Sequence, residues 1–364
     1  MAEKKRRFAV LTGGGDCPGL NAVIRAVIKT FLQNDCEVFG IYNGFNGLIN
    51  GNLKLMNYAD VSGILPRGGT ILGTTNRDNP FKFAVEENGE LVYYDMRDKV
   101  VENLQKHDIE ALVVIGGDGS LNIGAKLARE CGIKVVGVPK TIDNDLPCTE
   151  RTFGFDTAVA MATEAVDRLH TTAESHHRVM ALEVMGRYAG WIALHSGIAG
   201  GADVILIPEI PYDIDAVIKK IEDRKAKGKD FSIVVVAEGA KPIGGELSVA
   251  RVVKGSFEPI RLGGAGEKLV REIEERTGIE SRCTVLGYLQ RGGSPSSYDR
   301  ILSTRYGVAA AEACLRGEYN VMVSLENDQI VTVYIQKAAS SPRLVPVDSE
   351  IIRTGRQIGI CFGD

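Results

Sequence analysis

Long hydrophobic runs are missing from this chain of 364 residues. No apolar stretch approaches the roughly 18–20 residues that a helix needs to span a bilayer, and the first residues lack the apolar centre of a secretory signal. Paired cysteine motifs are missing as well. The seven cysteines are scattered and show no C-x-x-C spacing, which argues against a disulfide framework or a structural zinc site. These absences predict a protein of the reducing cytoplasm that makes no contact with a membrane.

A surplus of basic charge is also lacking. The chain has 43 Lys and Arg against 47 Asp and Glu, and its formal net charge is −4. No global positive field therefore attracts a nucleic acid, and we expect no nucleic-acid partner. What the chain has in abundance is glycine, with 42 residues, and many of them follow short apolar runs.

Short β-branched runs alternate with helical patterns along the whole chain. Parallel strands covered by helices are typical of such alternation, so we expect an α/β fold with parallel, doubly wound sheets flanked by helices. The expected strands cover residues 8–11, 37–42, 111–115, 134–138, 179–184, 204–207 and 232–236, and the expected helices include 21–32 and 157–173. Ligands of open α/β sheets bind at the carboxyl ends of the strands.

Two glycine-rich loops lie between a strand and a helix: Gly13-Gly14-Gly15-Asp16 and Gly116-Gly117-Asp118-Gly119-Ser120. Glycine lets the backbone approach a phosphate, and a helix N-terminus presents free N–H groups. Neither loop fits the Walker or dinucleotide-binding pattern. Each loop alone could be a tight turn, but two at successive strand ends favour a phosphate site.

The segment Thr141-Ile142-Asp143-Asn144-Asp145 follows a strand and Lys140. Its two carboxylates could hold a metal or act as a general base. The alternative is a turn that Asp and Asn side chains stabilise. Lys140 favours the functional reading, because it lies beside a loop already expected to bind phosphate.

Five arginines lie near glycine or beside a strand. A guanidinium matches the oxygens of a phosphate, which would suit a site for phosphorylated ligands. For any one of them, a surface salt bridge is the alternative. The five are Arg77, Arg178, Arg187, Arg282 and Arg291.

Five longer motifs make the chain resemble the phosphofructokinase family, on its mixed-substrate ATP and pyrophosphate branch. They occur in the order of that family, and the resemblance covers about residues 8–316. The motifs are LTGGGDCPGLN (11–21), GGDGS (116–120), PKTIDND (139–145), EVMGR (183–187) and LQRGGSP (289–295).

The resemblance implies an ATP-dependent 6-phosphofructokinase, which transfers the γ-phosphate of ATP to the 1-hydroxyl of fructose 6-phosphate and forms fructose 1,6-bisphosphate in glycolysis. Mg²⁺ is the implied cofactor. It also implies two domains with the active site in the cleft between them. Residues 1–153 plus 289–340 would bind ATP and Mg²⁺, and residues 154–288 plus 341–364 would bind fructose 6-phosphate. A cytoplasmic homo-oligomer, dimer or tetramer, is implied as well.

Site residues follow from the same resemblance, position by position. Asp143 would be the catalytic base, assisted by Thr141 and Arg187, and Asp118 would hold Mg²⁺. The donor would be bound by Gly15, Arg77, Gly117, Asp118, Gly119 and Ser120. The sugar phosphate would be bound by Thr141, Ile142, Asp143, Met185, Gly186, Arg187, Glu238, Tyr288 and Arg291, together with Arg178 and Arg282 reaching from a neighbouring subunit.

Two positions bear on the phosphoryl donor. Lys140 resembles the family members that use pyrophosphate, whereas Gly119 replaces the aspartate that those members typically carry. An aspartate would fill the space beside the donor and repel an α-phosphate, so Gly119 favours ATP. A pyrophosphate-dependent phosphotransferase remains the alternative enzyme.

Two further departures concern Tyr288 and Arg77. Tyr288 stands where the common bacterial enzymes have histidine, and its hydroxyl can still bind a phosphate. Arg77 follows a segment that is one residue longer than in those enzymes.

A nucleotide-sensing regulatory subunit without activity is the alternative from another class. Retention of Asp118, Thr141, Asp143 and Arg187 argues against it.

Overall fold

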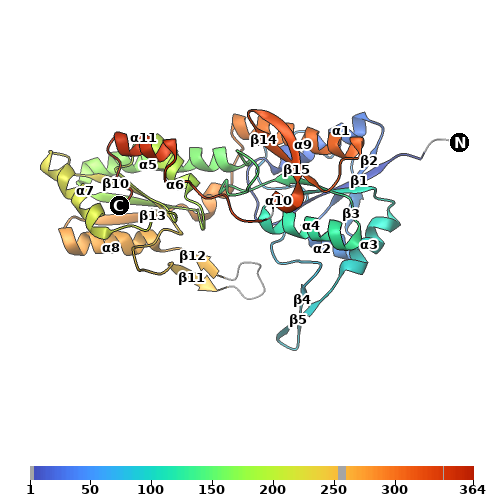
Figure 1. The fold of residues 1–364 in the computed structure, drawn as a ribbon, viewed down its shortest axis with the longest axis horizontal. Helices are drawn as coiled ribbons and strands as arrows, with labels where there is room; N and C mark the ends of the chain where they lie inside the picture. Colours follow the sequence, from blue (N-terminus) through green and yellow to red (C-terminus); the bar gives the residue numbers. More distant parts are fainter. Residues whose placement is uncertain (1–3, 253–259, 339) are drawn as a thin grey trace.

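The computed structural model describes residues 4–252, 260–338 and 340–364, and two separate sheets organise them (Figure 1). The larger sheet has seven strands in the order β15-β14-β7-β6-β1-β2-β3. Its strands are β1 (Arg7–Thr12), β2 (Glu37–Ile41), β3 (Leu53–Leu55), β6 (Ala111–Gly116), β7 (Val135–Pro139), β14 (Val321–Glu326) and β15 (Gln329–Tyr334).

The centre of this sheet is parallel, as the sequence predicts, but both edges are antiparallel. β1 pairs in parallel with β2 and β6, and β7 with β6 and β14, whereas β3 and β15 run against their neighbours. The turn between β14 and β15 consists of Asn327 and Asp328, both with positive φ. This conformation closes a tight hairpin because its twist matches that of the strands. The predicted parallel sheet is therefore extended at each edge by one antiparallel strand.

Alternation along the strands divides the core of the larger half into two layers. Phe8 and Val10 pack into one apolar cluster and Ala9 and Leu11 into another, on opposite faces of β1. The first face is covered by α1 (Leu20–Gln33) and α9 (Ser297–Arg316), which contact each other, and the second by α2 (Gly44–Asn50), α3 (Arg97–Lys106), α4 (Asp118–Cys131) and α10 (Ile335–Ala338). The sheet is thus wound on both faces.

The smaller sheet is entirely parallel, in the order β13-β8-β10-β9. Its strands are β8 (Val179–Val184), β9 (Val204–Leu206), β10 (Ser232–Ala237) and β13 (Ser281–Val285). Helices α5 (Phe155–His176) and α6 (Trp191–Ala199) cover one face, and α7 (Ile214–Ala226) and α8 (Ala265–Thr277) the other. Helix α5 is longer than the predicted 157–173, and its C-cap His177 has positive φ.

Two hairpins lie outside these sheets: β4 (Phe83–Glu87) with β5 (Glu90–Tyr94), and β11 (Val249–Val252) with β12 (Ile260–Leu262). The first projects from the larger half in Figure 1. Sequence analysis predicted neither, since their strands are short and not consistently apolar. Among the described residues, no helix combines the length and apolar character needed to cross a membrane.

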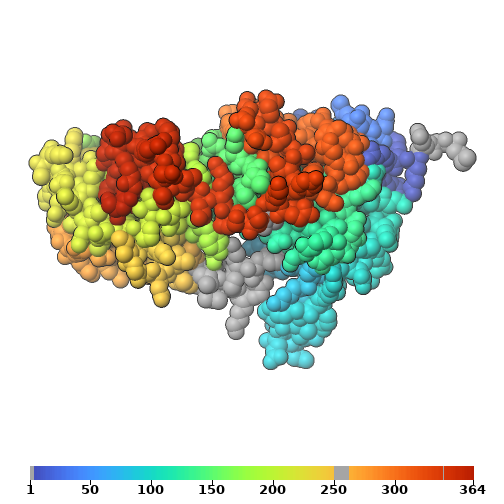
Figure 2. Space-filling view, viewed as in Figure 1, coloured from blue at the N-terminus to red at the C-terminus, as the bar shows by residue number. Residues whose placement is uncertain are grey.

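The chain passes between the two halves more than once. After β7 it enters α5, and it returns through the short helix η1 (Gly287–Arg291) into α9 and β14. The last segment runs back to α11 (Glu350–Gln357), where Gly355 lies against Phe362. In Figure 2 the C-terminal residues, in red, lie across both halves. The domain boundaries that the resemblance implies stay a prediction.

Candidate active site

The two glycine-rich loops lie side by side at the carboxyl ends of β1 and β6. Gly13 donates its N–H to the carbonyl of Ile115 at 2.9 Å. The buried Ser120 side chain fills the space between the loops, because a Cβ at Gly13 would stand 2.5 Å from Ser120 Oγ and a Cβ at Gly116 would clash with Ser120 Cβ. Glycine at both positions is thus required for the loops to meet, and the predicted contact of Ser120 with the donor stays a prediction.

The start of α4 presents an open polar surface. Gly117 is its N-cap, and Asp118 and Gly119 form its first, exposed residues. A Cβ at Gly119 would meet no atom within 4 Å. The free N–H groups of a helix N-terminus favour negative charge there. The structure therefore leaves room beside Gly119 for a ligand or for a larger side chain.

Lys140 braces the first glycine loop from within. Its side chain is buried, and Nζ donates to the carbonyl of Gly15 at 2.5 Å. Burial lowers the pKa of Lys140. One hydrogen of its ammonium group is thus engaged by the protein itself.

The segment after β7 is held by a local hydrogen-bond network. Asp143 N–H donates to Thr141 Oγ1 at 3.1 Å, and Thr152 donates its hydroxyl to the Thr141 carbonyl at 2.7 Å. Asn144 adopts positive φ and accepts from Thr152 N–H at 2.9 Å. Ile142 is fully buried in the core, so its side chain anchors this segment.

Asp143 lies at the centre of the candidate site. Its Oδ1 is buried and has no hydrogen-bond partner among the described residues. Burial raises the pKa of Asp143, while the Arg291 and Lys140 cations lower it and the Asp118 carboxylate raises it. A buried polar atom without a partner is uncommon in a folded protein and calls for an explanation. A ligand hydroxyl would supply the missing partner.

Asp145 is the second carboxylate of the 141–145 segment, and the family resemblance implies no role for it. Burial, together with the carboxylates of Asp143 and Asp118, raises its pKa to about 7, against the lowering effect of a hydrogen bond from Thr141. Three carboxylates therefore influence one another here. The spacing Asp143-Asn144-Asp145 was the signal in the sequence for this interaction, because it places two carboxylates on one short loop.

The smaller half contributes two loops that contact each other, one after β8 and one after β10. Gly239 donates its N–H to the Gly186 carbonyl at 3.1 Å, and Met185 donates its own to Oε1 of the buried Gln290 at 3.2 Å. Burial, together with the Asp143 carboxylate, raises the pKa of Glu238 to about 7. The Arg187 guanidinium lies 5.1 Å from the centre of the Tyr188 ring.

Arg291 connects the contributions of the two halves. Its Nη1 donates to the Asp16 carbonyl at 3.3 Å, and a Cβ at Gly15 would stand 3.0 Å from the same nitrogen. The cation lowers the pKa of both Asp143 and Glu238. The structure thus brings predicted donor and sugar residues together around Arg291.

Two predicted arginines lie elsewhere. Arg178 precedes β8 and pairs with Glu280 at 2.8 Å, and Arg282 on β13 pairs with both Glu280 and Glu274. They stand at the amino end of the smaller sheet, one strand length of about 20 Å from Met185. Within one chain they do not join the site. Arg77 lies in an exposed loop, and Tyr288 of η1 is 70% exposed.

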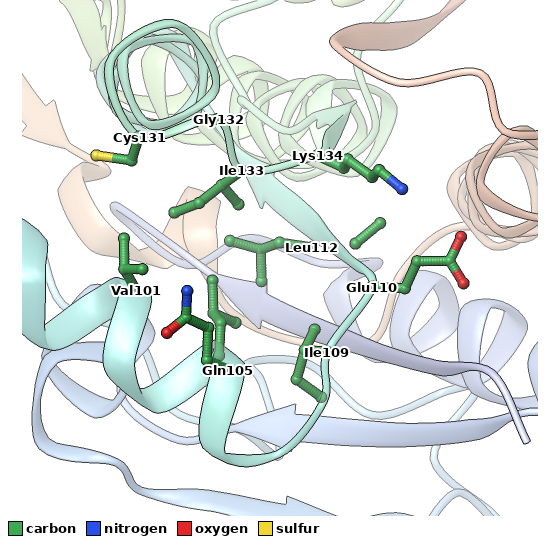
Figure 3. Close-up of a pocket in the computed structure, with 11 residues that line it drawn as sticks. Val101, Gln105, Ile109, Glu110, Leu112, Cys131, Gly132, Ile133 and Lys134 are labelled. Atoms are coloured by element: carbon green, nitrogen blue, oxygen red, sulfur yellow. The ribbon is translucent and has the colours of Figure 1, made fainter. Parts of the chain in front are cut away.

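A separate pocket of about 180 Å³ opens at the opposite, amino edge of the larger sheet (Figure 3). Ala111 and Leu112 at the start of β6 line it, together with Ile133. Gly116, at the other end of β6, lies beside the glycine loops. The pocket is therefore distinct from the candidate site.

Comparison with known proteins identifies the family. The sequence model of the family described as Phosphofructokinase matches residues 7–314. The chain belongs to the phosphofructokinase family. A relative from Clostridium perfringens (strain 13 / Type A), named ATP-dependent 6-phosphofructokinase 2, is 53% identical over 100% of both chains.

Other phosphofructokinase relatives carry a different name. A protein from Amycolatopsis mediterranei (strain S699) named pyrophosphate–fructose 6-phosphate 1-phosphotransferase is 51% identical over 94% of this chain and 97% of its own. Among solved structures, Pichia pastoris phosphofructokinase in the T-state matches with a TM-score of 0.79 and 34% identity. The match covers 93% of this chain but only 36% of the Pichia chain. The predicted two-sided α/β fold is confirmed by this likeness.

Proposed function

We propose that this phosphofructokinase is ATP-dependent and phosphorylates the 1-hydroxyl of fructose 6-phosphate, yielding fructose 1,6-bisphosphate in glycolysis. The observation that carries the proposal is the buried, unpartnered Oδ1 of Asp143, which lies where the charges of Asp118, Lys140 and Arg291 converge. A base beside phosphate-binding cations is what transfer to an alcohol requires.

In this proposal Asp143 Oδ1 accepts the hydroxyl proton as the new phosphate ester forms. Thr141 holds the backbone of Asp143 in place through its hydroxyl. Arg291 lies against the donor loop, and Arg187 serves as the cation that neutralises the phosphoryl group in transfer. Such charge neutralisation and positioning supply most of the rate in phosphoryl transfer.

The donor phosphates would lie along Gly15, Gly117 and the first turn of α4, with Arg77 and Ser120 completing the donor site. Met185, Gly186, Glu238 and the residues of the 141–143 segment would hold the sugar phosphate, with Tyr288 at the rim. Glu238 suits a sugar hydroxyl, since burial raises its pKa to about 7 and a hydroxyl can donate to it when it is ionised.

The carboxylates fit a magnesium ion that arrives with the donor. Mg²⁺ in such sites is held by one or two carboxylates plus substrate phosphates. The described residues contain no group of three His, Cys, Asp or Glu side chains that could hold a metal. The exposed Asp118 carboxylate at the start of α4 matches an ion held by one carboxylate plus the donor phosphates, and it would hold the ion. When bound, Mg²⁺ would neutralise charge on the donor phosphates.

The choice of ATP over pyrophosphate rests on Gly119 and Lys140, because relatives of both names are about equally similar to this chain. Space beside Gly119 is open, which suits the larger donor. Lys140 already donates to Gly15, so its presence is explained by support of the loop and does not require pyrophosphate.

We also propose the domain division 1–153 plus 289–340 and 154–288 plus 341–364, a cytoplasmic location and a homo-oligomer. The position of Arg178 and Arg282 at the far edge of the smaller sheet suits residues that would reach a neighbouring subunit's site. Each already pairs with Glu280, so a substrate phosphate would compete with that carboxylate.

Initial rates with fructose 6-phosphate and Mg²⁺, with ATP or pyrophosphate at matched concentrations, test the proposal. We expect a clear preference for ATP. A preference for pyrophosphate would mean that Lys140 outweighs the open space at Gly119. Activity with neither donor would contradict the enzymatic proposal and favour the nucleotide-sensing subunit.

A further inference from the structure

Arg343 joins the segment that carries Asp143 to the helix that follows the predicted sugar loop. Its backbone N–H donates to the Asp145 carbonyl at 2.7 Å, and its Nη1 donates to the Asn144 carbonyl at 3.2 Å. Its guanidinium lies 4.4 Å from the centre of the Trp191 ring, whose Nε1–H donates to the Arg343 carbonyl at 2.9 Å. One residue of the C-terminal segment thus contacts both halves of the molecule.

The elements that Arg343 joins are those expected to hold the two substrates. Asn144 and Asp145 directly follow Asp143. Trp191 is the first residue of α6, which begins four residues after Arg187. Arg343 itself lies beyond residues 7–314, which the family sequence model matches.

The charge of Arg343 is poorly compensated. Burial lowers its pKa, the Arg151 cation lowers it further, and the Glu150 carboxylate raises it. Among the described residues, the guanidinium contacts the Asn144 carbonyl oxygen and the face of the Trp191 ring, and no carboxylate. Burial of a guanidinium without an ion pair costs free energy. What the guanidinium gains is rigid, directional hydrogen bonding together with stacking, which a lysine cannot reproduce.

We propose that Arg343 is a positioning residue, whose guanidinium acts through the Asn144 carbonyl and the Trp191 ring to set the carboxylate of Asp143 relative to the predicted sugar loop. The inference deepens the proposed function and rests on it. A shift of about 1 Å in a reacting group can cost 10²-fold in rate. The Arg343 guanidinium contacts Asn144 and Trp191, which are not among the residues predicted to bind substrate. Its loss should therefore change the chemical step more than substrate binding.

Steady-state kinetics of Arg343→Ala and Arg343→Lys test this inference against Arg353→Ala. Arg353 lies in the same C-terminal segment but is exposed. We expect kcat of Arg343→Ala to fall about 10- to 100-fold while both KM values stay within about threefold. Arg343→Lys keeps the charge but loses the planar fork, so it should recover only part of kcat. Arg353→Ala should match the wild type.

Two readouts separate positioning from a general loss of structure. Trp191 is the only tryptophan in the chain, so its emission reports directly on the stacked guanidinium. We expect the emission to change in Arg343→Ala at temperatures where circular dichroism is unaltered. We also expect added guanidinium, but not sodium at equal ionic strength, to restore part of kcat.

Normal kcat in Arg343→Ala would overturn the inference while leaving the proposed function intact. A fall in kcat of Arg343→Ala that is accompanied by a weaker circular dichroism signal would also overturn it, if neither Arg343→Lys nor added guanidinium recovers kcat. That result would mean a purely structural role. An inactive wild-type chain would overturn the proposed function and, with it, this inference.

Discussion

Asp299 of α9 caps α5 by accepting two hydrogen bonds from Thr157, one from its N–H at 2.8 Å and one from its hydroxyl at 2.5 Å. The N-cap of α5 is Gly154, which has no side chain to do so. Thr157 Oγ1 in turn accepts from the N–H of Ser296, the N-cap of α9, at 3.0 Å. The first turns of two helices, one on each sheet, are thereby held together.

Asp299→Asn should reduce the dependence of stability on pH. Burial raises the pKa of Asp299 to about 6, so the folded state binds its proton more tightly than the unfolded state. This contribution to stability is therefore full below about pH 4 and is lost as pH rises to about 6. The variant should remove on the order of 2–3 kcal/mol of this change. Urea unfolding at pH 4, 5 and 6 measures how the free energy of unfolding changes with pH, and Asp230→Asn, at an exposed residue, is the control. If the free energy of unfolding changes equally with pH in both variants, the assignment to Asp299 is refuted.

Asp143→Asn should lower kcat by about 100-fold or more, with smaller effects on both KM values. The amide cannot accept the hydroxyl proton, while its similar size preserves the shape of the buried site. Steady-state kinetics with fructose 6-phosphate and ATP measure the loss, and Asp230→Asn again serves as control. A near-normal kcat would remove Asp143 from the role of base.

The pH profile of kcat/KM should show an acidic limb well above the ordinary range of aspartate. Burial raises the pKa of Asp143, the base, and also that of the neighbouring Asp145, so activity should fall as the pH drops while still above the ordinary pKa of an aspartate. In Asp145→Asn a nearby negative charge is gone, Asp143 ionises more readily, and the limb should move to lower pH. An unshifted limb would show that Asp145 does not influence the titrating group.

Gly119→Asp should reduce kcat/KM for ATP at least about tenfold more than kcat/KM for pyrophosphate. The open space around Gly119 accommodates the side chain, but its charge would repel a nucleotide phosphate. Gly119→Ala adds a Cβ without charge and should change either value little. Equal losses with both donors would instead indicate damage to α4, and the donor argument would fail.

The sequence by itself determined the pattern of the fold and the location of the candidate site. Apolar runs such as 8–11 and 111–115 became central strands because continuous hydrophobicity is stable only with both faces covered. The glycine loops follow directly after β1 and β6, and Asp143 lies four residues after the end of β7. Since parallel strands end at a common edge, their neighbourhood could be predicted without knowing any tertiary contact.

Only the tertiary structure decided the contacts between elements distant in sequence. Asp299 beside Thr157, and Arg343 between Asp145 and Trp191, depend on which helices and segments pack together, and no local periodicity encodes that choice. The same holds for the antiparallel edge strands, for Arg178 and Arg282 lying away from the site, and for the raised pKa of Asp145. Burial and electrostatics act through space, so they arise only when the chain has closed around these groups.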